Sequence, residues 1–273
     1  MRPAKRPLPL RILPNRLRES LFYRHYRPRF SAWRHLYERA ELAYAPGHYM
    51  QDLSPGDVIS DSIAFLGHYE RPLTTQLVSR ARSGGGLLVD VGANLGYFSL
   101  LWAAAHPSSR AIAIEASPRN LACLRANVAA NHLQERISIV DKAAGREPGT
   151  LPFQLGPPDQ TGWGGFAAAP SNETVMVQIV RLDDLVPGGA RVDFLKIDIE
   201  GADTWALMGA SRLLHERRVR EIWFEENLER MGELGIPQGS PGRFLKECGY
   251  RLECISSAPR TLEWRAMPIG VGQ

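Results

Sequence analysis

The stretch of sequence that decides the fold is Leu87-Leu88-Val89-Asp90-Val91-Gly92-Ala93-Asn94-Leu95-Gly96-Tyr97-Phe98-Ser99-Leu100. Its apolar residues up to Asp90 indicate a buried strand, and its two glycines allow a tight turn. The apolar pattern from Leu95 to Ala105 then predicts a helix that starts at this turn. Because the first N–H groups of a helix have no partner within it, strand, turn and helix together predict a nucleotide cradle.

The spacing of this turn indicates which nucleotide it suits. A dinucleotide fingerprint reads G-x-G-x-x-G, whereas Asn94 replaces the second glycine here and the pattern is Asp-x-Gly-x-x-x-Gly. The carboxylate of Asp90 would repel a pyrophosphate but suits a positively charged ligand. S-adenosylmethionine (SAM) carries a sulfonium and an ammonium, so the turn favours SAM over NAD as the cofactor.

The next expected strand, Arg110–Glu115, also ends in an acid. A carboxylate at this position in nucleotide-binding α/β folds can accept hydrogen bonds from both ribose hydroxyls. The alternative is that Asp90 and Glu115 are merely the polar ends of their strands. Their places at the ligand-side ends of consecutive strands favour the binding role.

Strands alternate with helices along the rest of the chain, which predicts an α/β fold with a largely parallel sheet. Further strands are expected at 137–141, 192–198, 220–225, 250–255 and 261–266. Further helices are expected at 72–82, 117–131, 202–217 and 241–248. A hairpin or edge insertion is expected from 151–155 and 175–180, joined by a Gly/Pro-rich stretch at 156–170. Ligand sites in such sheets lie at the carboxyl ends of the strands.

Acidic residues close several of these strands and would gather at that edge. They are Asp90, Glu115, Asp141, Asp198 and Glu225. Asp141 could instead cap a turn, and Glu225 could pair with an Arg or a Lys. Strand alternation places Lys196, Asp198 and Glu200 on one face, which favours a catalytic cluster over a surface ion-pair network.

In these blocks the chain resembles the FkbM-type SAM-dependent methyltransferases, which have the Rossmann-like class I methyltransferase fold. The resemblance covers about Gly67 to Tyr250 and rests on four ordered blocks. They are Gly67-His68-Tyr69-Glu70, Val89–Phe98, Glu115–Asn120 and Leu195–Ala202. The family often has Pro directly after the second acid, where this chain has Ala116-Ser117, and often has Glu at the position of Asp203.

The resemblance implies a Rossmann-like, doubly wound, mostly parallel sheet and methyl transfer from SAM, which leaves S-adenosylhomocysteine (SAH). The implied acceptor is a small molecule with a hydroxyl, commonly a sugar or a secondary metabolite of natural-product biosynthesis. N-methylation is the less favoured alternative. The residues expected to bind the cofactor are Tyr69, Glu70, Asp90, Gly92, Ala93, Asn94, Gly96, Tyr97, Phe98, Glu115, Ala116, Ser117, Asn120, Asp141, Lys142, Ala143 and Asp198.

Methyl transfer to an alcohol needs a base within hydrogen-bond distance of the hydroxyl, because an alcohol is a poor nucleophile at neutral pH. Asp198 is the first candidate by position, and His68 and Glu200 are the alternatives. Lys196 could stabilise a developing alkoxide or simply pair with Glu200. Carboxylates with a lysine between them make a poor metal site, so we expect no metal.

The net charge of +4 is concentrated in an N-terminal extension, residues 1–50, which precedes the methyltransferase domain at 51–273. Its first 40 residues carry eleven Lys and Arg against two Glu, with aromatic residues between them. Such a mix could bind nucleic acid or an anionic surface. We favour a helical arm whose aromatic side chains pack on the domain while its arginines face solvent. The extension could also join two copies of the chain.

Other classes of function have less support from the motifs. An RNA methyltransferase could use the basic arm, but the Asn/Asp-Pro-Pro-Tyr/Phe motif of amino-group methylation is absent, so nucleic acid is not the expected partner. An NAD-dependent enzyme would need the missing third glycine, and a non-catalytic scaffold would not need the acids.

No apolar run reaches the roughly 20 residues of a transmembrane helix, and no signal peptide is expected. The three cysteines suit a reducing compartment, so we expect a cytoplasmic enzyme.

Overall fold

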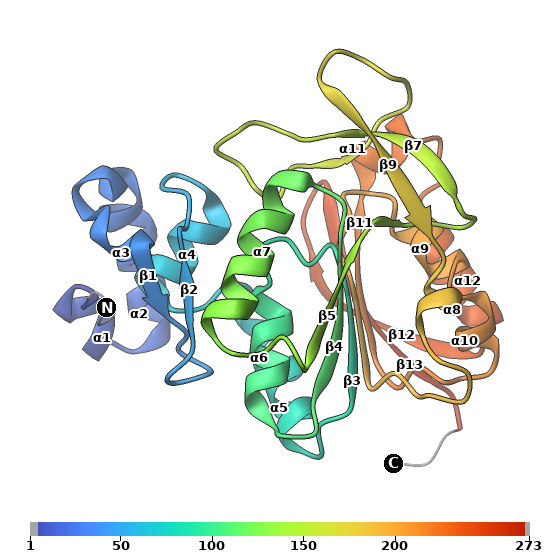
Figure 1. Cartoon of the computed structure of the whole chain (residues 1–273), viewed down its shortest axis with the longest axis horizontal. Helices are drawn as coiled ribbons and strands as arrows, with labels where there is room; N and C mark the ends of the chain where they lie inside the picture. The colour runs from blue at the N-terminus through green and yellow to red at the C-terminus, as the bar shows by residue number, and fades with distance from the viewer. Residues whose placement is uncertain (1–4, 271–273) are drawn as a thin grey trace.

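A sheet of seven strands forms the centre of the protein in the computed structural model, which describes residues 5–270 (Figure 1). In spatial order the strands are β12 (Tyr250–Ser257), β13 (Thr261–Pro268), β11 (Ile222–Asn227), β10 (Phe194–Ile197), β3 (Leu87–Val91), β4 (Arg110–Glu115) and β5 (Ile137–Asp141). β13 is antiparallel to both of its neighbours, and the other pairs are parallel. The strand order reverses between β3 and β10, which confirms the predicted Rossmann-like, doubly wound α/β fold.

Helices cover both faces of this sheet, because successive residues of a buried strand point to opposite sides. Leu88 packs with the helices of one face, which are α5 (Arg71–Arg82), α6 (Tyr97–Ala105) and α7 (Pro118–Ala130). Val89 packs with the other face, which has α8 (Leu182–Leu185), α9 (Asp203–Met208), α10 (Ser211–His215) and α12 (Ser240–Glu247). These layers follow one another from left to right in Figure 1.

Two helices differ from their predicted bounds for local reasons. The helix expected from residue 95 begins at Tyr97, because Gly96 has a φ of +91°. The helix expected at 202–217 is split into α9 and α10 at Gly209. A Cβ on Gly209 would lie 2.1 Å from the carbonyl oxygen of Gly145, so the close approach of two backbones interrupts the helix.

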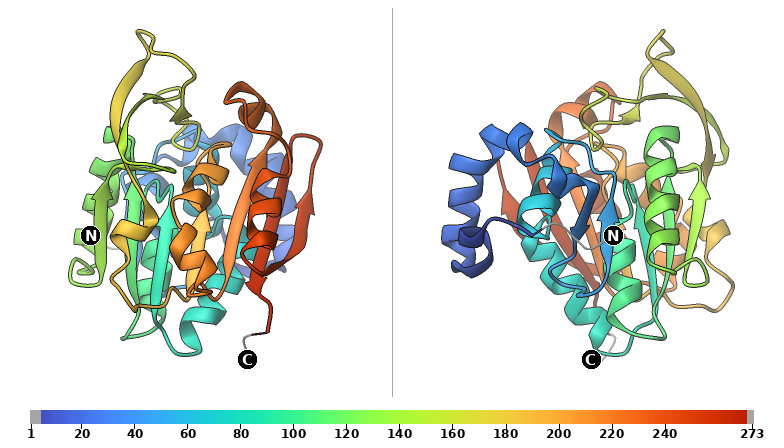
Figure 2. Two further views of the ribbon diagram at one scale, coloured as in Figure 1. Left: turned by 90° about the vertical axis from the view of Figure 1, so that its right-hand side faces the viewer. Right: turned by 60° about the vertical axis from the view of Figure 1, so that its left-hand side comes forward.

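The predicted hairpin consists of β7 (Gly149–Gln154) and β9 (Thr174–Val180), which pair antiparallel. Two short strands that the sequence did not predict, β6 (Ala143–Ala144) and β8 (Gly165–Phe166), extend it into a separate four-stranded sheet. The hairpin projects from one end of the molecule in both views of Figure 2. The Gly/Pro-rich stretch between its strands is therefore available to cover the edge of the central sheet.

The N-terminal residues form a lobe that packs on α4 (Val58–Leu66) and α7. The lobe contains α1 (Leu8–Ile12), α2 (Asn15–Leu21), η1 (Phe22–Tyr26), η2 (Arg27–Trp33), α3 (His35–Glu38), β1 (Arg39–Glu41) and β2 (Tyr49–Gln51). The ring of Phe65 in α4 contacts the rings of Phe22, Tyr26, Trp33 and Tyr37, at centroid distances of 5.5–6.4 Å. These four aromatic side chains of the extension therefore pack on α4, whereas Tyr23 is 51% exposed.

Asn127 of α7 and Asn131, the residue just after this helix, fasten the lobe to the central domain. The N–H of Tyr49 donates to Oδ1 of Asn131 at 2.8 Å, and the N–H of Gln51 donates to Oδ1 of Asn127 at 2.9 Å. An edge strand such as β2 leaves backbone donors unpaired, and these side chains take the place of a neighbouring strand. No helix within residues 5–270 is long and apolar enough to cross a membrane.

Candidate functional site

Two adjoining cavities open at the carboxyl ends of the central strands. The first has a volume of about 220 Å³ and the second about 420 Å³. They share Glu70, Lys196, Asp198 and Glu225, which form their common wall. Ligand sites in proteins measure roughly 300–1,000 Å³, so the two cavities together have the size of a site for a cofactor and a small molecule.

The glycine turn after β3 lines the first cavity. A Cβ on Gly92 would lie 2.0 Å from the backbone oxygen of Asp198, so only glycine fits where β3 and β10 end side by side. The N–H groups of Gly92 and Ala93 both donate to the carbonyl of Ile114 at 3.0 Å. These two amides are therefore used within the protein, whereas the predicted cradle concerns the first N–H groups of the helix, which begins at Tyr97, and stays a prediction.

Glu115 presents a carboxylate to the same cavity from the end of β4. Its two oxygens accept hydrogen bonds from the N–H groups of Asn94 (2.7 Å) and Ser117 (2.8 Å), which fix the side chain. Burial raises the pKa of Glu115, and these bonds oppose the rise. Each carboxylate oxygen keeps a second lone pair, so Glu115 can still accept hydrogen bonds from the hydroxyls of a ligand.

Most residues expected at the cofactor site line the first cavity. They are Tyr69, Glu70, Gly92, Ala93, Asn94, Tyr97, Phe98, Glu115, Ala116, Asn120, Lys142, Ala143 and Asp198. The structure places Asp90, Gly96, Ser117 and Asp141 outside this lining. Ser117 instead caps α7, and the exposed Asp141 pairs with Arg125 at 3.2 Å.

The position of Asp90 does not fit its expected role, which was to contact a positively charged ligand. Its fully buried side chain accepts a hydrogen bond from Oγ of Ser99 at 2.7 Å, and its other oxygen lies 3.9 Å from Nζ of Lys196. Burial raises its pKa, and Lys196 opposes the rise. Asp90 and Lys196 are directly paired residues of neighbouring strands, so Asp90 faces this lysine rather than the cavity.

Lys196 is the buried cation at the centre of the site. Its Nζ lies 3.3 Å from Oδ2 of Asp198 and donates to the carbonyl of Gly92 at 3.0 Å. Burial disfavours the charged form, but Asp198, Asp90 and Glu70 outweigh burial and raise the pKa of Lys196. Lys196 therefore remains charged at neutral pH and holds Asp198 at the junction of the two cavities.

Glu200 does not share a strand face with Lys196 and Asp198, so the expected alternation is wrong here. β10 ends at Ile197, and Glu200 lies in the following turn with a φ of +52°. Its carboxylate accepts a hydrogen bond from Nδ2 of Asn227 at 2.9 Å and lines the first cavity. The lysine pairs with Asp198 and not with Glu200. Burial, and then the charge of Asp198, raise the pKa of Glu200 to about 7.

Three further carboxyl groups surround Asp198. Burial, and then the charge of Asp198, raise the pKa of both Glu70 and Asp203 to about 7 and that of Glu225 to about 9. Asp203 accepts hydrogen bonds from the N–H groups of Ile199 and Glu225, whereas the side chain of Glu225 has no hydrogen-bond donor among the described residues. Within residues 5–270, no group of His, Cys, Asp and Glu side chains is arranged to hold a metal ion.

His68 lies outside both cavities. Its ring is buried and contacts the ring of Tyr44 edge-on, with the centroids 5.9 Å apart. Burial lowers the pKa of His68 to about 4. Its position therefore gives no support to the alternative that His68 is the base.

The first cavity also has a wall that the sequence analysis missed. It comes from the start of α4 and from the hairpin with its connecting stretch, and its residues include Asp57, Val58, Ile59, Phe153, Gln160, Thr161, Gly162, Trp163, Gly164 and Phe166. Asp57 joins the two parts, because its carboxylate accepts from the N–H groups of Ser60 (2.8 Å) and Thr161 (3.0 Å). Asn120 donates to the carbonyl of Thr161 at 2.9 Å. The one sequence signal was Asp57, an N-cap residue ahead of an apolar run.

Acidic and aromatic side chains line the second cavity. Besides the four shared residues, its lining includes Pro72, Leu73, Ile197, Trp223, Phe224, Ile255, Ser256 and Glu263. Four carboxyl groups therefore face one ammonium group, which makes this cavity acidic. The sequence analysis did not identify Glu263, which lies on a strand far along the chain from the others.

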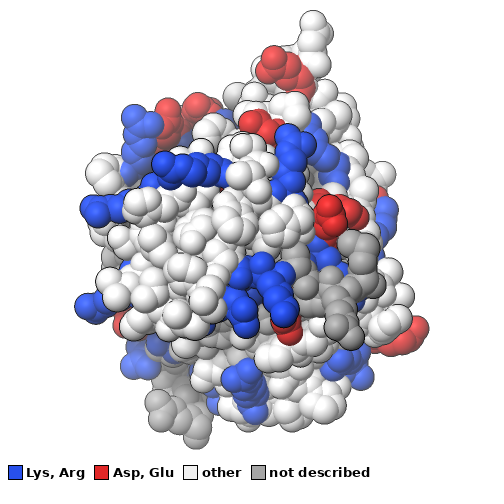
Figure 3. Space-filling model, turned by 90° about the vertical axis from the view of Figure 1, so that its left-hand side faces the viewer, with Lys and Arg blue, Asp and Glu red and all other residues white. Residues whose placement is uncertain are grey.

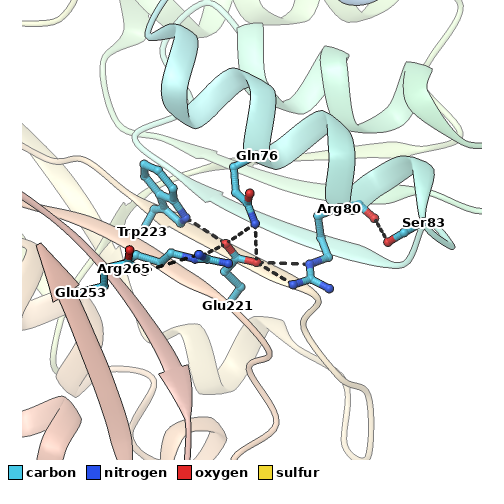
Figure 4. Close-up of polar contacts among 7 residues, drawn as sticks. All are labelled: Gln76, Arg80, Ser83, Glu221, Trp223, Glu253 and Arg265. Atoms are coloured by element: carbon cyan, nitrogen blue, oxygen red, sulfur yellow. Dashed lines mark hydrogen bonds and ion pairs between the residues drawn. The ribbon is translucent and has the colours of Figure 1, made fainter. Parts of the chain in front are cut away.

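A buried carboxylate holds Trp223 at this cavity (Figure 4). Glu221 is fully buried and accepts a hydrogen bond from Nε1 of Trp223 at 3.1 Å. It also accepts hydrogen bonds from Gln76, Arg80 and Arg265, at 2.9, 2.9 and 2.8 Å. Since the donors come from α5, β11 and β13, this network joins three elements beside the second cavity.

Residues 90–252 match the family model described as the methyltransferase FkbM domain. The chain belongs to the FkbM methyltransferase family. A curated relative, the methyltransferase sdnD of Sordaria araneosa, is 27% identical over 179 residues. The match covers 50% of this chain and 65% of the relative, so it spans less than two thirds of the relative's length. The predicted family is confirmed.

Three solved structures are similar to this FkbM-family chain. The methyltransferase FkbM from Methylobacillus flagellatus KT is 16% identical, with a TM-score of 0.49, and the match covers 88% of this chain and 59% of that one. The O-methyltransferase from Bacillus cereus in complex with SAH is 13% identical, with a TM-score of 0.41 and coverages of 73% and 82%. TomG from Streptomyces achromogenes, an O-methyltransferase involved in tomaymycin synthesis and solved with SAM, is 15% identical, with a TM-score of 0.42 and coverages of 74% and 82%.

Proposed function

We propose that this FkbM-family protein transfers a methyl group from SAM to a hydroxyl of a small molecule, such as a sugar or a secondary metabolite. The observation that carries the proposal is the junction of two cavities at Lys196 and Asp198. In this proposal the first cavity holds the cofactor and the second holds the acceptor. The methyl group then passes between them beside Asp198.

The donor set of the first cavity fits SAM. Glu115 is held in place by two backbone N–H groups and suits the two ribose hydroxyls. The carboxyl groups of Glu70 and Asp198 line the cavity and suit the positively charged end of SAM, the role that the sequence analysis gave to Asp90. The N–H groups of Gly92 and Ala93 are already bonded, so this turn offers them to no pyrophosphate, which disfavours NAD.

When bound, SAM supplies a methyl group on a sulfonium, so that the C–O bond forms as the C–S bond breaks and a neutral thioether leaves. Asp198 accepts the proton of the acceptor hydroxyl as general base, because its carboxylate is partly exposed and lines both cavities. Lys196 holds that carboxylate in place. Glu200 and Glu70, each with a pKa raised to about 7, are the alternative bases.

The second cavity supports a small acceptor rather than RNA. Lys196 is the one cation among the described residues that line it, and Asp198 already pairs with this lysine, so the cavity offers no cationic partner to a phosphate backbone. The aromatic faces of Trp223 and Phe224 suit the apolar part of a small ring. N-methylation of a small molecule is the alternative that experiment has to separate from O-methylation.

Methyl transfer from labelled SAM tests this proposal. The protein is incubated with SAM labelled in its methyl group and with a panel of hydroxylated sugars and secondary metabolites, and mass spectrometry locates the label. We expect the label on an oxygen of a panel member. A label on nitrogen would select the N-methyltransferase alternative, and a label on RNA added to the same mixture would contradict the acceptor class.

A further inference from the structure

Four of the large apolar side chains that are exposed in the described part of the chain lie on the N-terminal lobe. Leu8 is 60% exposed, Ile12 69%, Leu17 58% and Tyr23 51%. Only three others are exposed to this degree within residues 5–270, and they are Trp163, Met176 and Ile269. Exposed apolar side chains on three consecutive elements of one lobe, here α1, α2 and η1, are a sign of an interaction surface.

The packing of α1 forces two of these side chains outward. Leu10 is buried in the core, and Arg6 donates hydrogen bonds to the carbonyls of Ala64 (2.9 Å) and Ile63 (3.2 Å) in α4. Leu8 and Ile12 are four residues apart and therefore share a side of the helix, whereas Leu10 points the other way. Since α1 is anchored at its start and through Leu10, its exposed side is a fixed feature of the surface.

The same lobe is strongly basic. Residues 5–37 carry nine Lys and Arg but one acid, Glu19, which is paired with Arg71 at 2.8 Å. Several exposed cations have no acidic side chain within ion-pair distance among the described residues, and they include Lys5, Arg11, Arg16 and Arg24. Figure 3 views the molecule from this side and shows Lys and Arg side chains around a broad uncharged area. The surface is therefore apolar and cationic at once.

We propose that this face of the N-terminal lobe, consisting of Leu8, Ile12, Leu17, Tyr23 and the cations around them, binds the surface of an anionic phospholipid bilayer. The apolar side chains enter the interfacial region, and the Lys and Arg side chains meet the anionic head groups. The lobe thereby places the protein at a membrane surface without crossing it. This proposal stands independently of the methyl-transfer reaction.

Charge complementarity selects the bilayer over two other occupants. A second copy of the same face would bring its exposed cations, which include Lys5, Arg11, Arg16 and Arg24, against the same cations, so a symmetric dimer through this face is repulsive. RNA would satisfy the cations, but the leucine and isoleucine side chains would have no apolar partner in a phosphate backbone. An anionic bilayer satisfies both parts of the surface.

Sedimentation of the full chain with vesicles tests the proposal. We expect binding to phosphatidylcholine vesicles that contain about a quarter phosphatidylserine, and much weaker binding to phosphatidylcholine alone. The double variant Ile12→Asp/Leu17→Asp should reduce binding at least tenfold. The matched variant Met176→Asp, at a residue of β9 that is 58% exposed, should leave binding unchanged. Each of Arg11→Gln and Arg16→Gln should reduce binding about fivefold.

Thermal melting followed by circular dichroism checks that each variant is folded. We expect all of them to fold, because the substituted side chains are exposed. Binding to both kinds of vesicle alike, binding to neither, or an equal loss in Met176→Asp would overturn the proposal. A dimer that forms without vesicles and is abolished by Ile12→Asp/Leu17→Asp would assign the face to a second copy. Binding to RNA in preference to the anionic vesicles would assign it to nucleic acid.

Discussion

Glu221 and Glu225 lie four residues apart, one just before β11 and one within it, yet their carboxyl groups have opposite surroundings. Glu221 is fully buried and is surrounded by donors from three elements (Figure 4). Glu225 faces the carboxyl groups of Asp198, Asp203 and Glu200, and burial together with these acids raises its pKa to about 9. Residues four apart along an extended chain lie on the same side of a sheet, so one side carries both an acid with hydrogen-bond donors around it and an acid without them.

The difference separates a structural carboxylate from those of a functional site. A buried carboxylate costs free energy unless donors or cations compensate it. The protein supplies these partners at Glu221, which lines neither cavity, but gives no hydrogen-bond donor among the described residues to the side chain of Glu225 at their junction. Uncompensated acids with raised pKa values are expected where a site has to move a proton or bind a positive ligand.

The largest effect is expected on turnover, from a substitution of Asp198 at the junction of the two cavities. Asp198→Asn keeps the shape of the side chain but removes the base, so turnover should fall by about 10²–10⁴-fold. SAH affinity should change far less, because Glu115 still holds the ribose end. Steady-state kinetics and calorimetry on the same preparation measure both quantities. An unchanged turnover in Asp198→Asn, with a large loss in Glu200→Gln or Glu70→Gln, would move the base to that residue.

The compensated carboxylate should affect stability instead of turnover. Glu221→Gln leaves Arg80 and Arg265 without their buried anion, which should reduce the free energy of unfolding by about 3–5 kcal/mol. Urea denaturation measures this change, and turnover per folded molecule should stay within a few-fold of wild type. The control is Glu229→Gln, which breaks an exposed ion pair with Arg260 and should change stability by less than about 0.5 kcal/mol. If Glu221→Gln and Glu229→Gln had the same free energy of unfolding, Glu221 would not be the structural carboxylate described here.

The ribose-binding role of Glu115 should appear in affinity. Glu115→Ala should weaken SAM binding by about 1.5–3 kcal/mol, the range for hydrogen bonds to a charged group. Isothermal titration calorimetry measures the change. Glu263→Ala, which removes a carboxyl group of the second cavity only, is the matched control and should leave SAM affinity nearly unchanged. If both variants lost affinity equally, Glu115 would have no specific contact with the cofactor.

The smallest effect is expected on the pH dependence of stability. The pKa of Glu225 is about 9 in the folded protein against an ordinary value of 4.5, so between these values the folded state keeps a proton that the unfolded chain releases. Stability contributed by the protonated group is therefore lost as pH rises from about 5 to 9. Glu225→Gln cannot ionise, and its Tm should exceed that of wild type at pH 9 by about 2–4 °C, the shift that corresponds to about 1 kcal/mol. Melting curves at pH 5 and pH 9 that shift in parallel for both proteins would contradict the raised pKa.

The sequence predicts those features that depend on local pattern. The strand, turn and helix around Gly92 follow from apolar runs and glycines, and Glu115 follows from its place at the end of β4. The direction of Asp90 could not be predicted, because its partner Lys196 lies on a neighbouring strand far along the chain. Glu200 was assigned to a strand face because nothing in the local pattern shows that β10 ends at Ile197.

The missed parts of the site all come from distant segments. Thr161 reaches the first cavity because Asp57 and Asn120 hold its backbone, and this contact depends on how the hairpin folds over the sheet. Glu263 reaches the second cavity only because β13 pairs with β11. Long-range pairing of this kind leaves no periodic signal in either segment, so composition and spacing could not reveal it.

Calorimetric titration of the wild-type protein with SAH and, separately, with NAD tests the central claim most directly. The account predicts saturable binding of SAH at one site per chain, because Glu115 meets the ribose and the acids of the junction meet the charged end. It predicts no binding of NAD, because the glycine turn has already used its N–H groups. Equal affinity for NAD, or no binding of SAH to the folded protein, would contradict the account.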